Sequence, residues 1–305
     1  MGYIETLSRN ANTLKKTLNK VMVDEGRSER LILNKYLHVT TMTDAWEDDL
    51  DKAGPGLASE RGEAEPIVLG STQEGDVWRY IATTYALKMQ ATKELLEDGK
   101  YEKAIDLQKF NRDCMWVTCE YLAAGLLINR ANTSYLGGDG VPLGSDSHRI
   151  TVGGTYSNLL STPAGPSMSG IELAVSSLLV MPGRDGLIQS VMPRAAVYPA
   201  NQWGSWARLL RSEKDPTPGN FTAVNVLRSE DWNLRPVMVP FWQGAPNDWA
   251  ILTDASDGPQ WRWRRKPHAN SWVDNNIWVM NSSIQMRVAP GWSNPRGIFF
   301  GGSAT

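Results

Sequence analysis

The feature that most constrains the fold is a long helical pattern in the middle of the chain, from about residue 101 to residue 129. Apolar residues recur there at spacings of four and three, at Phe110, Cys114, Val117, Tyr121, Ala124 and Ile128. This recurrence predicts a continuous apolar seam along one amphipathic helix. At 1.5 Å per residue such a helix is roughly 43 Å long. Few compact enzymes need an uninterrupted helix of that length, so we expect it to be a structural spine.

The chain before this helix divides into three parts. Residues 3–24 predict a helix with one broad apolar face, formed by Ile4, Leu7, Leu14, Leu18 and Val21. Residues 46–76 are acidic and repeatedly broken by glycine and proline, which predicts a long projecting loop or a loose hairpin. Residues 77–90 predict a strand that runs into a helix, which Gly99 ends.

After Asn132 short β-prone runs alternate with helical ones. We expect a helix from Glu172, a buried strand from Arg194, and a second helix that Asn201 caps. This alternation predicts a small α/β domain. From about Trp232 onward the pattern consists mostly of strands.

Composition excludes some classes of protein. A net charge of −2 and a pI near 6.0 are not those of a protein that coats nucleic acid through excess positive charge. The two cysteines, Cys114 and Cys119, point to different faces of the predicted helix, so we expect free, buried thiols. Thirteen tryptophans against five phenylalanines favour cores and subunit interfaces; stacking on sugars or bases is the alternative.

No secretory signal or stretch of ~20 apolar residues is visible in the sequence. We therefore expect a soluble protein that is made in the cytoplasm and has no membrane partner.

The stretch DGVPLGSDSH, residues 139–148, gathers residue types that hydrolases use. Ser145 or Ser147 with His148 is one reading of it. However, Asp146, Ser147 and His148 are consecutive, and neighbours on an extended segment alternate in direction, so they cannot form a relay. No G-x-S-x-G elbow, phosphate-binding loop or metal-ligand spacing accompanies them. We assign no catalytic, cofactor-binding or metal residues.

The same stretch is typical of a turn. We expect Asp139 and Gly140 to make the turn and Leu143 to anchor it. Ser145 and His148 then bond to backbone or to a neighbouring group.

A basic and aromatic run, QWRWRRKPH, spans Gln260–His268. On a strand Trp261 and Trp263 share one face, and Arg262 and Arg264 share the other. One interpretation is an amphipathic strand with surface arginines. Another is a surface that meets an acidic neighbour, such as residues 46–76. Contact with nucleic acid is the third.

The order of these pieces resembles the Hong-Kong-97-type (Johnson) fold of tailed-phage major capsid proteins. DGVPLGSDSH resembles the "DG-x-x-L-F-S-x-x-H" stretch of phage head proteins, including Mu-like major head subunits, and Gly144 stands where the family usually has Phe. The matching residues are Asp139, Gly140, Leu143, Ser145 and His148. The segment GGTYSNLL resembles the following G-x-x-S-N segment through Gly154, Ser157 and Asn158.

The resemblance implies an α+β chain with the parts of that fold. These are an N-terminal arm at 1–45, an E-loop at 46–76, a P-domain at 77–150 with the spine helix at about 101–129, an α/β A-domain at 151–231, antiparallel P-domain return strands at 232–290, and a C-terminal strand of the A- or P-domain at 291–305.

The implied function is assembly, not catalysis, with no cofactor. Such proteins form pentamers and hexamers of an icosahedral shell around packaged double-stranded DNA. The implied partners are other copies of the chain, a scaffolding protein, a portal, a decoration protein and the DNA. The chain would be assembled in the host cytoplasm and reside in the virion. Two alternatives stay open: an encapsulin-type shell around protein cargo, and, more remotely, a serine hydrolase.

Overall fold

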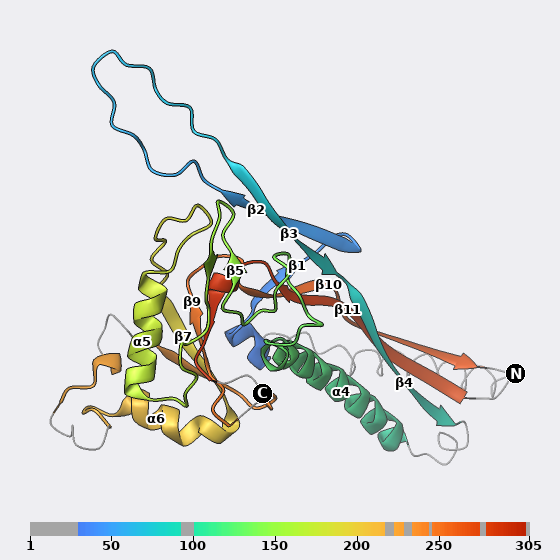
Figure 1. The fold of residues 1–305 in the computed structure, drawn as a ribbon. Helices are drawn as coiled ribbons and strands as arrows, with labels where there is room; N and C mark the ends of the chain where they lie inside the picture. The colour runs from blue at the N-terminus through green and yellow to red at the C-terminus, as the bar shows by residue number, and fades with distance from the viewer. Residues whose placement is uncertain are drawn as a thin grey trace, which may run out of the picture.

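The computed structural model describes residues 30–92, 101–216, 223–228, 234–243, 246–274 and 279–302. It is a mixed α and β structure with an elongated body, a more compact part beside it and a long hairpin that projects from their junction (Figure 1). The helix expected at 3–24 and the helix end expected at Gly99 lie outside the described residues.

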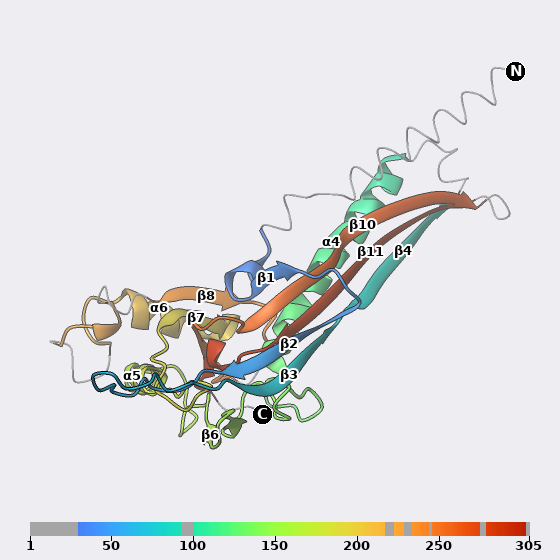
Figure 2. The same cartoon turned by 90° about the horizontal axis from the view of Figure 1, so that it is seen from above.

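The elongated body consists of one long helix and one four-stranded sheet. Helix α4 spans Tyr101–Ile128 and confirms the predicted spine. The sheet has the order β1-β10-β11-β4, and α4 lies along it (Figure 2). Its strands are β1 (His38–Thr41), β10 (Pro259–Asp274), β11 (Val279–Trp292) and β4 (Thr83–Thr92). A short 3₁₀ helix, η1 (Ile32–Lys35), packs beside α4.

The predicted seam on α4 is wrong about which face points inward. Phe110, Val117, Tyr121 and Ile128 are between 39% and 64% exposed, and Cys114 is exposed too. The buried face instead carries Gln108, Asn111, Met115, Trp116, Cys119, Glu120, Ala123, Ala124 and Leu127. Three of these residues are polar, so the sequence of the inner face shows no continuous apolar stripe. Of the two thiols expected to be buried, only Cys119 is.

Residues 83–92 correct a second expectation. They form strand β4 and do not begin a helix. β4 pairs antiparallel with β11 over its whole length, from Thr83 opposite Val288 to Thr92 opposite Val279. The pairing partner lies almost 200 residues further along the chain, so no local pattern reports it. A distant strand thus decides the structure of this segment.

The compact part holds the small α/β unit. Its sheet has the order β12-β9-β7-β8, with strands β12 (Ile298–Phe300), β9 (Ala250–Thr253), β7 (Pro193–Pro199) and β8 (Arg235–Val239). Ala195 and Val197 belong to the core shared with α4, and Ala196 and Tyr198 to the core under α5 and α6. A sheet buried on both faces explains the continuous apolar run of β7.

Helix α5 (Met168–Leu179) confirms the helix expected around Glu172, and Ser167 caps it by accepting a hydrogen bond from the Gly170 amide. Helix α6 (Trp203–Arg211) begins later than expected. Asn201 is not its N-cap, because it lies inside a 3₁₀ turn, η2 (Ala200–Gln202). The remaining short elements are η3 (Val226–Arg228) and η5 (Pro295–Gly297).

The strand pairing also groups the late strands differently from expectation. The resemblance implies that residues 232–290 are antiparallel P-domain return strands, but the strands found there divide between two sheets. β10 and β11 pair with each other in the sheet beside α4, whereas β8 pairs parallel with β7 and β9 pairs antiparallel with β7. The segment from Arg235 to Thr253 therefore lies in the sheet of the α/β unit.

The projecting element is a hairpin, as one of the two alternatives for residues 46–76 predicted. Strands β2 (Trp46–Ala53) and β3 (Gln73–Ile81) pair antiparallel. The residues between them, 54–72, are nearly all exposed and extend away from the body (Figure 1). We call residues 54–72 the hairpin tip.

Tryptophans fill the cores, as their number predicted. Trp206, Trp242, Trp249 and Trp261 are fully buried. Trp46 and Trp203 are more than half exposed, so not every tryptophan serves the core. Across the part of the chain that the structure describes, we find no helix both long enough and apolar enough to pass through a bilayer.

Candidate functional site

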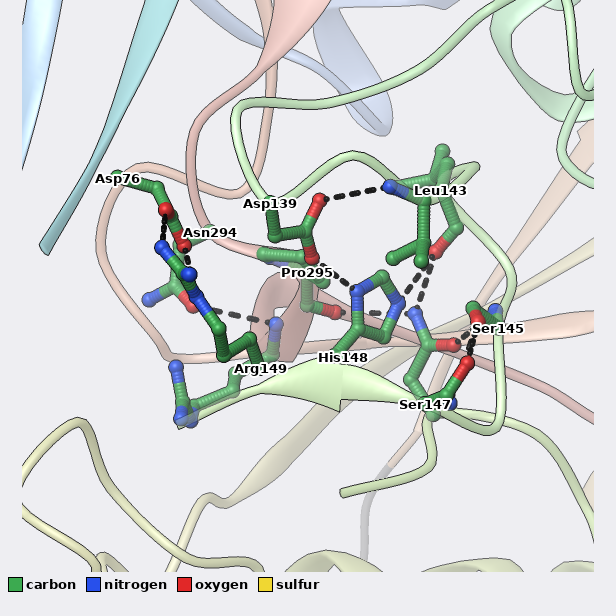
Figure 3. A network of polar contacts seen from close by, with 12 residues as sticks. Asp76, Asp139, Leu143, Ser145, Ser147, His148, Arg149, Asn294 and Pro295 are labelled. Atoms are coloured by element: carbon green, nitrogen blue, oxygen red, sulfur yellow. Dashed lines mark hydrogen bonds and ion pairs between the residues drawn. The ribbon is translucent and has the colours of Figure 1, made fainter. Parts of the chain in front are cut away.

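The stretch at 139–148 folds into a network of polar contacts that includes Asp139, Leu143, Ser145 and His148 (Figure 3). Together with Asn158, which bonds to Leu143 and Ser145, these residues form what we call the polar junction. The His148 ring is fully buried and lies between two acceptors. Its Nδ1 lies 2.7 Å from Asp139 Oδ2, and its Nε2 lies 3.2 Å from the Leu143 carbonyl oxygen. A backbone carbonyl can only accept, so Nε2 carries a hydrogen and donates it.

Asn158 provides the second half of the polar junction. Its side-chain amide donates to the carbonyl oxygens of Leu143, at 2.7 Å, and of Pro295 and Ile298, both at 3.3 Å. Its Oδ1 accepts from the Ser145 amide at 3.0 Å. One buried side chain thereby joins the turn after α4 to the segment that leads into β12.

The turn has the predicted form. Gly140 has a φ of +77°, a left-handed conformation that favours glycine. Leu143 is fully buried. β5 (His148–Arg149) then pairs with β6 (Thr155–Tyr156), which brings Asn158 back to the turn. The expected roles of Asp139, Gly140, Leu143, Ser145 and His148 are therefore confirmed.

The packing around Gly144 explains why glycine stands here in place of the phenylalanine of the phage head-protein pattern. A Cβ at this position would lie 3.3 Å from both Leu159 Cδ2 and Phe300 Cδ2. These two side chains occupy the space into which a larger residue would extend. The packing around the turn is thus complete with glycine, and a phenylalanine here requires both neighbours to move.

The geometry disfavours the hydrolase reading. A general base must offer a free nitrogen to the serine hydroxyl, but His148 Nε2 donates to a carbonyl. Ser145 Oγ and Ser147 Oγ contact each other at 3.1 Å and contact neither ring nitrogen. The full burial of the ring also denies a substrate access to it.

A second polar region lies where the hairpin meets the body. We call it the hairpin base and define it as β2, β3 and their arginine partners Arg149, Arg184 and Arg262. Side chains alternate along β2, so Glu47, Asp49 and Asp51 share the face toward the body. Arg262 of β10 contacts Glu47 at 3.2 Å and also bonds to Asp49.

The other two arginines come from loops and from β5. Arg184 forms an ion pair with Asp51, and Arg149 forms one with Asp76 of β3. Thr151 donates to the same Asp51 at 3.2 Å. The hairpin therefore contacts β10, β5 and the loop after α5 at separate points. These contacts fix its direction relative to the body.

Arg262 also contacts an aromatic ring, and that residue continues the polar network. Its guanidinium lies 3.7 Å from the ring centroid of Tyr80. The Tyr80 hydroxyl lies 2.6 Å from Ser293 Oγ, which donates to Asp49 at 2.5 Å. Burial raises the pKa of the Tyr80 phenol well above its usual range, so this hydroxyl stays protonated. These contacts link Arg262, Tyr80, Ser293 and Asp49 into one network.

The opposite face of the hairpin is solvated. Asp48 pairs with Arg79 across the strands at 2.7 Å, and the hydrogen bond from Arg79 lowers the pKa of Asp48.

A cleft of about 380 Å³ lies beside the inner face of the hairpin, lined in part by Asp49, Asp51 and Ser293. Within the described ranges, no cluster of three or more His, Cys, Asp or Glu side chains could hold a metal ion.

The basic run at Gln260–His268 lies partly in the core and partly on the surface. Trp261 and Trp263 are buried, and Arg262 meets the acidic strand β2, so the acidic-neighbour interpretation is confirmed within one chain. Arg264 is exposed, as the surface-arginine interpretation has it. Sequence reasoning missed Arg149, Arg184 and Asp76. The acidic residues at every second position, 47, 49 and 51, are the sequence pattern that could have predicted a charged face on this strand.

Neither a protein-family model nor a curated protein matches the chain. Solved structures do. The capsid of an empty GTA particle matches at 13% identity and a TM-score of 0.53, with 88% of each chain covered. A structure from Gordonia phage Cozz matches at 9% identity and a TM-score of 0.57, over 90% of this chain and 87% of that one. One from Microbacterium phage Oxtober96 matches at 8% identity and 0.53, over 88% and 89%.

Sequence identities this low support no conclusion about function. The alignments nevertheless cover nearly the whole of this chain and of each matched chain. The likeness extends beyond one motif, because it covers 88% to 90% of this chain. This chain therefore has the mixed α and β fold of phage and GTA capsid structures.

Proposed function

We propose that the chain is the major capsid protein of a tailed bacteriophage, with the Hong-Kong-97-type fold, and that its role is structural. The observation that carries the proposal is an extended hairpin held at its base and free at its tip, on a fold shared with a GTA capsid. A monomer gains nothing from such an element. It is suited to lie over a neighbouring copy.

In this proposal residues 1–45 are the N-terminal arm, 46–76 the E-loop, 77–150 the P-domain and 151–231 the A-domain. Residues 291–305 supply a C-terminal strand to the A-domain. The late P-domain is limited to β10 and β11, since β8 and β9 pair with β7. The Asp139–His148 turn and Asn158 resemble Mu-like head subunits more than encapsulins, which favours DNA over protein cargo.

The assembly is a shell of pentamers and hexamers around double-stranded DNA. Many modest contacts between copies add up, so no single contact needs to be strong. Contacts between different surfaces of identical copies close into rings, as capsomers require. A scaffolding protein, a portal and decoration proteins are the expected further partners, and the virion is the expected location.

Expression of the full chain, with a scaffolding protein, and negative-stain electron microscopy test the proposal. Closed shells or capsomer rings are expected. A chain that stays monomeric under all these conditions contradicts it. Shells purified from the natural source should contain DNA; enzyme cargo instead would favour the encapsulin alternative.

Deletion of residues 53–66 tests the role of the hairpin. We expect a folded monomer with an unchanged melting temperature, because nearly all these side chains are exposed, and we expect no shells. Normal shells from this variant would show that the hairpin tip is dispensable.

A further inference from the structure

The two outer edges of the body sheet differ in how well they are protected. Among the residues that the structure describes, β10 pairs with β1 from Gln260 to Trp263, and its later residues have no strand on their outer side. That stretch carries Arg264, Arg265, Lys266 and Pro267, and its register with β11 shifts twice. Charges, proline and bulges are the means by which proteins prevent strands from pairing at an edge.

The opposite edge, β4, carries far less of this protection. Its ten residues pair with β11 in continuous register and include neither proline nor glycine. Among the described residues, no strand pairs with its outer side. Lys88 is its one charged residue. A long, regular edge with a single charge leaves backbone donors and acceptors available for another strand along residues 83–91.

The hairpin tip contains a segment of matching character. Ile67, Val68 and Leu69 are 81%, 73% and 95% exposed. Branched residues such as Ile and Val favour strands, yet no hydrogen bond joins these three residues to any other part of the described chain. The tip and β4 lie at opposite ends of the molecule in both views (Figures 1 and 2), so they cannot meet within one chain.

The charges of the two segments are complementary. Glu60, Glu63 and Glu65 outnumber Arg61 in the residues that precede Ile67. The one charged residue of β4 is Lys88, which is exposed. Opposite charges favour contact and disfavour other orientations, so an acidic segment beside Lys88 favours this pairing.

We infer that residues 66–70 of one copy add as a strand to the open edge of β4 in a second copy. This inference rests on the proposed function and identifies the surface that receives the hairpin tip. The contact joins two different surfaces, so repeated head-to-tail it produces a ring or an open chain of subunits.

Cross-linking tests it directly. In a Cys114→Ser background, which removes the exposed native thiol, Val68→Cys is combined with Leu87→Cys at the middle of β4. Mild oxidation of assembled material should give a ladder of covalent multimers on a denaturing gel. Each single-cysteine variant should give monomers. The matched control, Val68→Cys with Arg264→Cys on the protected edge, should give none.

A second pair of variants needs no oxidation. Val68→Pro removes a backbone donor from the added strand and should reduce shell yield at least tenfold while the monomer keeps its melting temperature. Leu57→Pro, in the other arm of the tip at 80% exposure, should assemble normally. If the wild-type chain assembles but Val68→Pro does too and no ladder forms, the inference is overturned and the proposed function stands. If the wild-type chain never assembles, both are overturned.

Discussion

The polar junction and the hairpin base both join segments that are far apart in the chain, and they use different chemistry. In the polar junction, His148 and Asn158 are fully buried, and most of their partners are backbone carbonyls. In the hairpin base, carboxylates that remain between 13% and 31% exposed meet arginines. Burial makes each lost bond costly, whereas partial solvation limits both the gain and the loss.

The difference matches the two tasks that we propose. The polar junction joins α4 to the final strand and must not move. The hairpin must keep its direction, yet one chain has to serve positions in a shell that are not identical. Ion pairs at the hairpin base tolerate small changes in angle better than a buried amide that bonds to three carbonyls. The following variants test this contrast, from the largest expected effect to the smallest.

His148→Ala should have the largest effect. It leaves the Asp139 carboxylate, which is 3% exposed, without its closest partner and creates a cavity. We expect the free energy of unfolding to fall by about 4 kcal/mol, as for other broken buried pairs, measured by urea denaturation. Asp146→Ala, an exposed neighbour in the same turn, should stay near wild type. Equal effects from both variants would contradict the role of the polar junction.

Asn158→Ala should cost about 3 kcal/mol, because several buried backbone groups lose their partner at once. Asn158→Asp sharpens the test. It keeps an acceptor for the Ser145 amide but turns a carboxylate toward three carbonyl oxygens, so it should be at least as destabilising. If Asn158→Asp is better tolerated than Asn158→Ala, the donor role of this amide is wrong.

Arg262→Ala should cost about 2 kcal/mol, between the values for exposed and buried pairs. The variant releases Glu47 and Asp49 and exposes Tyr80, so hydrogen exchange in β2 and β3 should accelerate. Arg264→Ala, two residues away and exposed, is the matched control and should change neither quantity. Equal hydrogen-exchange protection of β2 and β3 in both variants would show that the charge pairs do not stabilise the hairpin.

The smallest effect concerns pH and a third polar contact. Glu120 of α4 accepts from the amides of Ile32, at 2.5 Å, and Leu33, at 3.2 Å. Burial raises the pKa of its carboxyl, and the two amides and Lys35 only partly oppose this. The folded state therefore holds its proton to a higher pH than the unfolded state, whose glutamates titrate near ~4.3.

Stability should consequently fall as pH rises from about 4 through the raised pKa of Glu120. Asp48 has the opposite sign, because the hydrogen bond from Arg79 lowers its pKa, so its contribution is lost as pH falls. Unfolding measured across this range should show a slope that Glu120→Gln removes. Glu172→Gln, an exposed glutamate on α5, should leave the slope unchanged.

The polar junction was more predictable from sequence than the hairpin base. Asp139, Gly140, Leu143, Ser145 and His148 lie within ten residues, and a turn is a local structure. Their roles follow from residue types that favour left-handed backbone, burial or hydrogen bonding. The hairpin base joins segments up to about 215 residues apart. The sequence showed the acids at 47, 49 and 51 and the arginine at 262, but only the fold shows which meet.

The sequence by itself determined which segments are helices, strands and turns wherever periodicity is local, as in α4, α5, β7 and β11. Only the tertiary structure decided which face of α4 points inward, because Gln108 and Glu120 bond inside the core and interrupt its apolar pattern. It likewise decided that residues 83–92 form a strand and that β8 and β9 join β7. The physical reason is the same in each case. Propensity acts within a few residues, whereas strand pairing and buried hydrogen bonds depend on partners that folding brings from a distance.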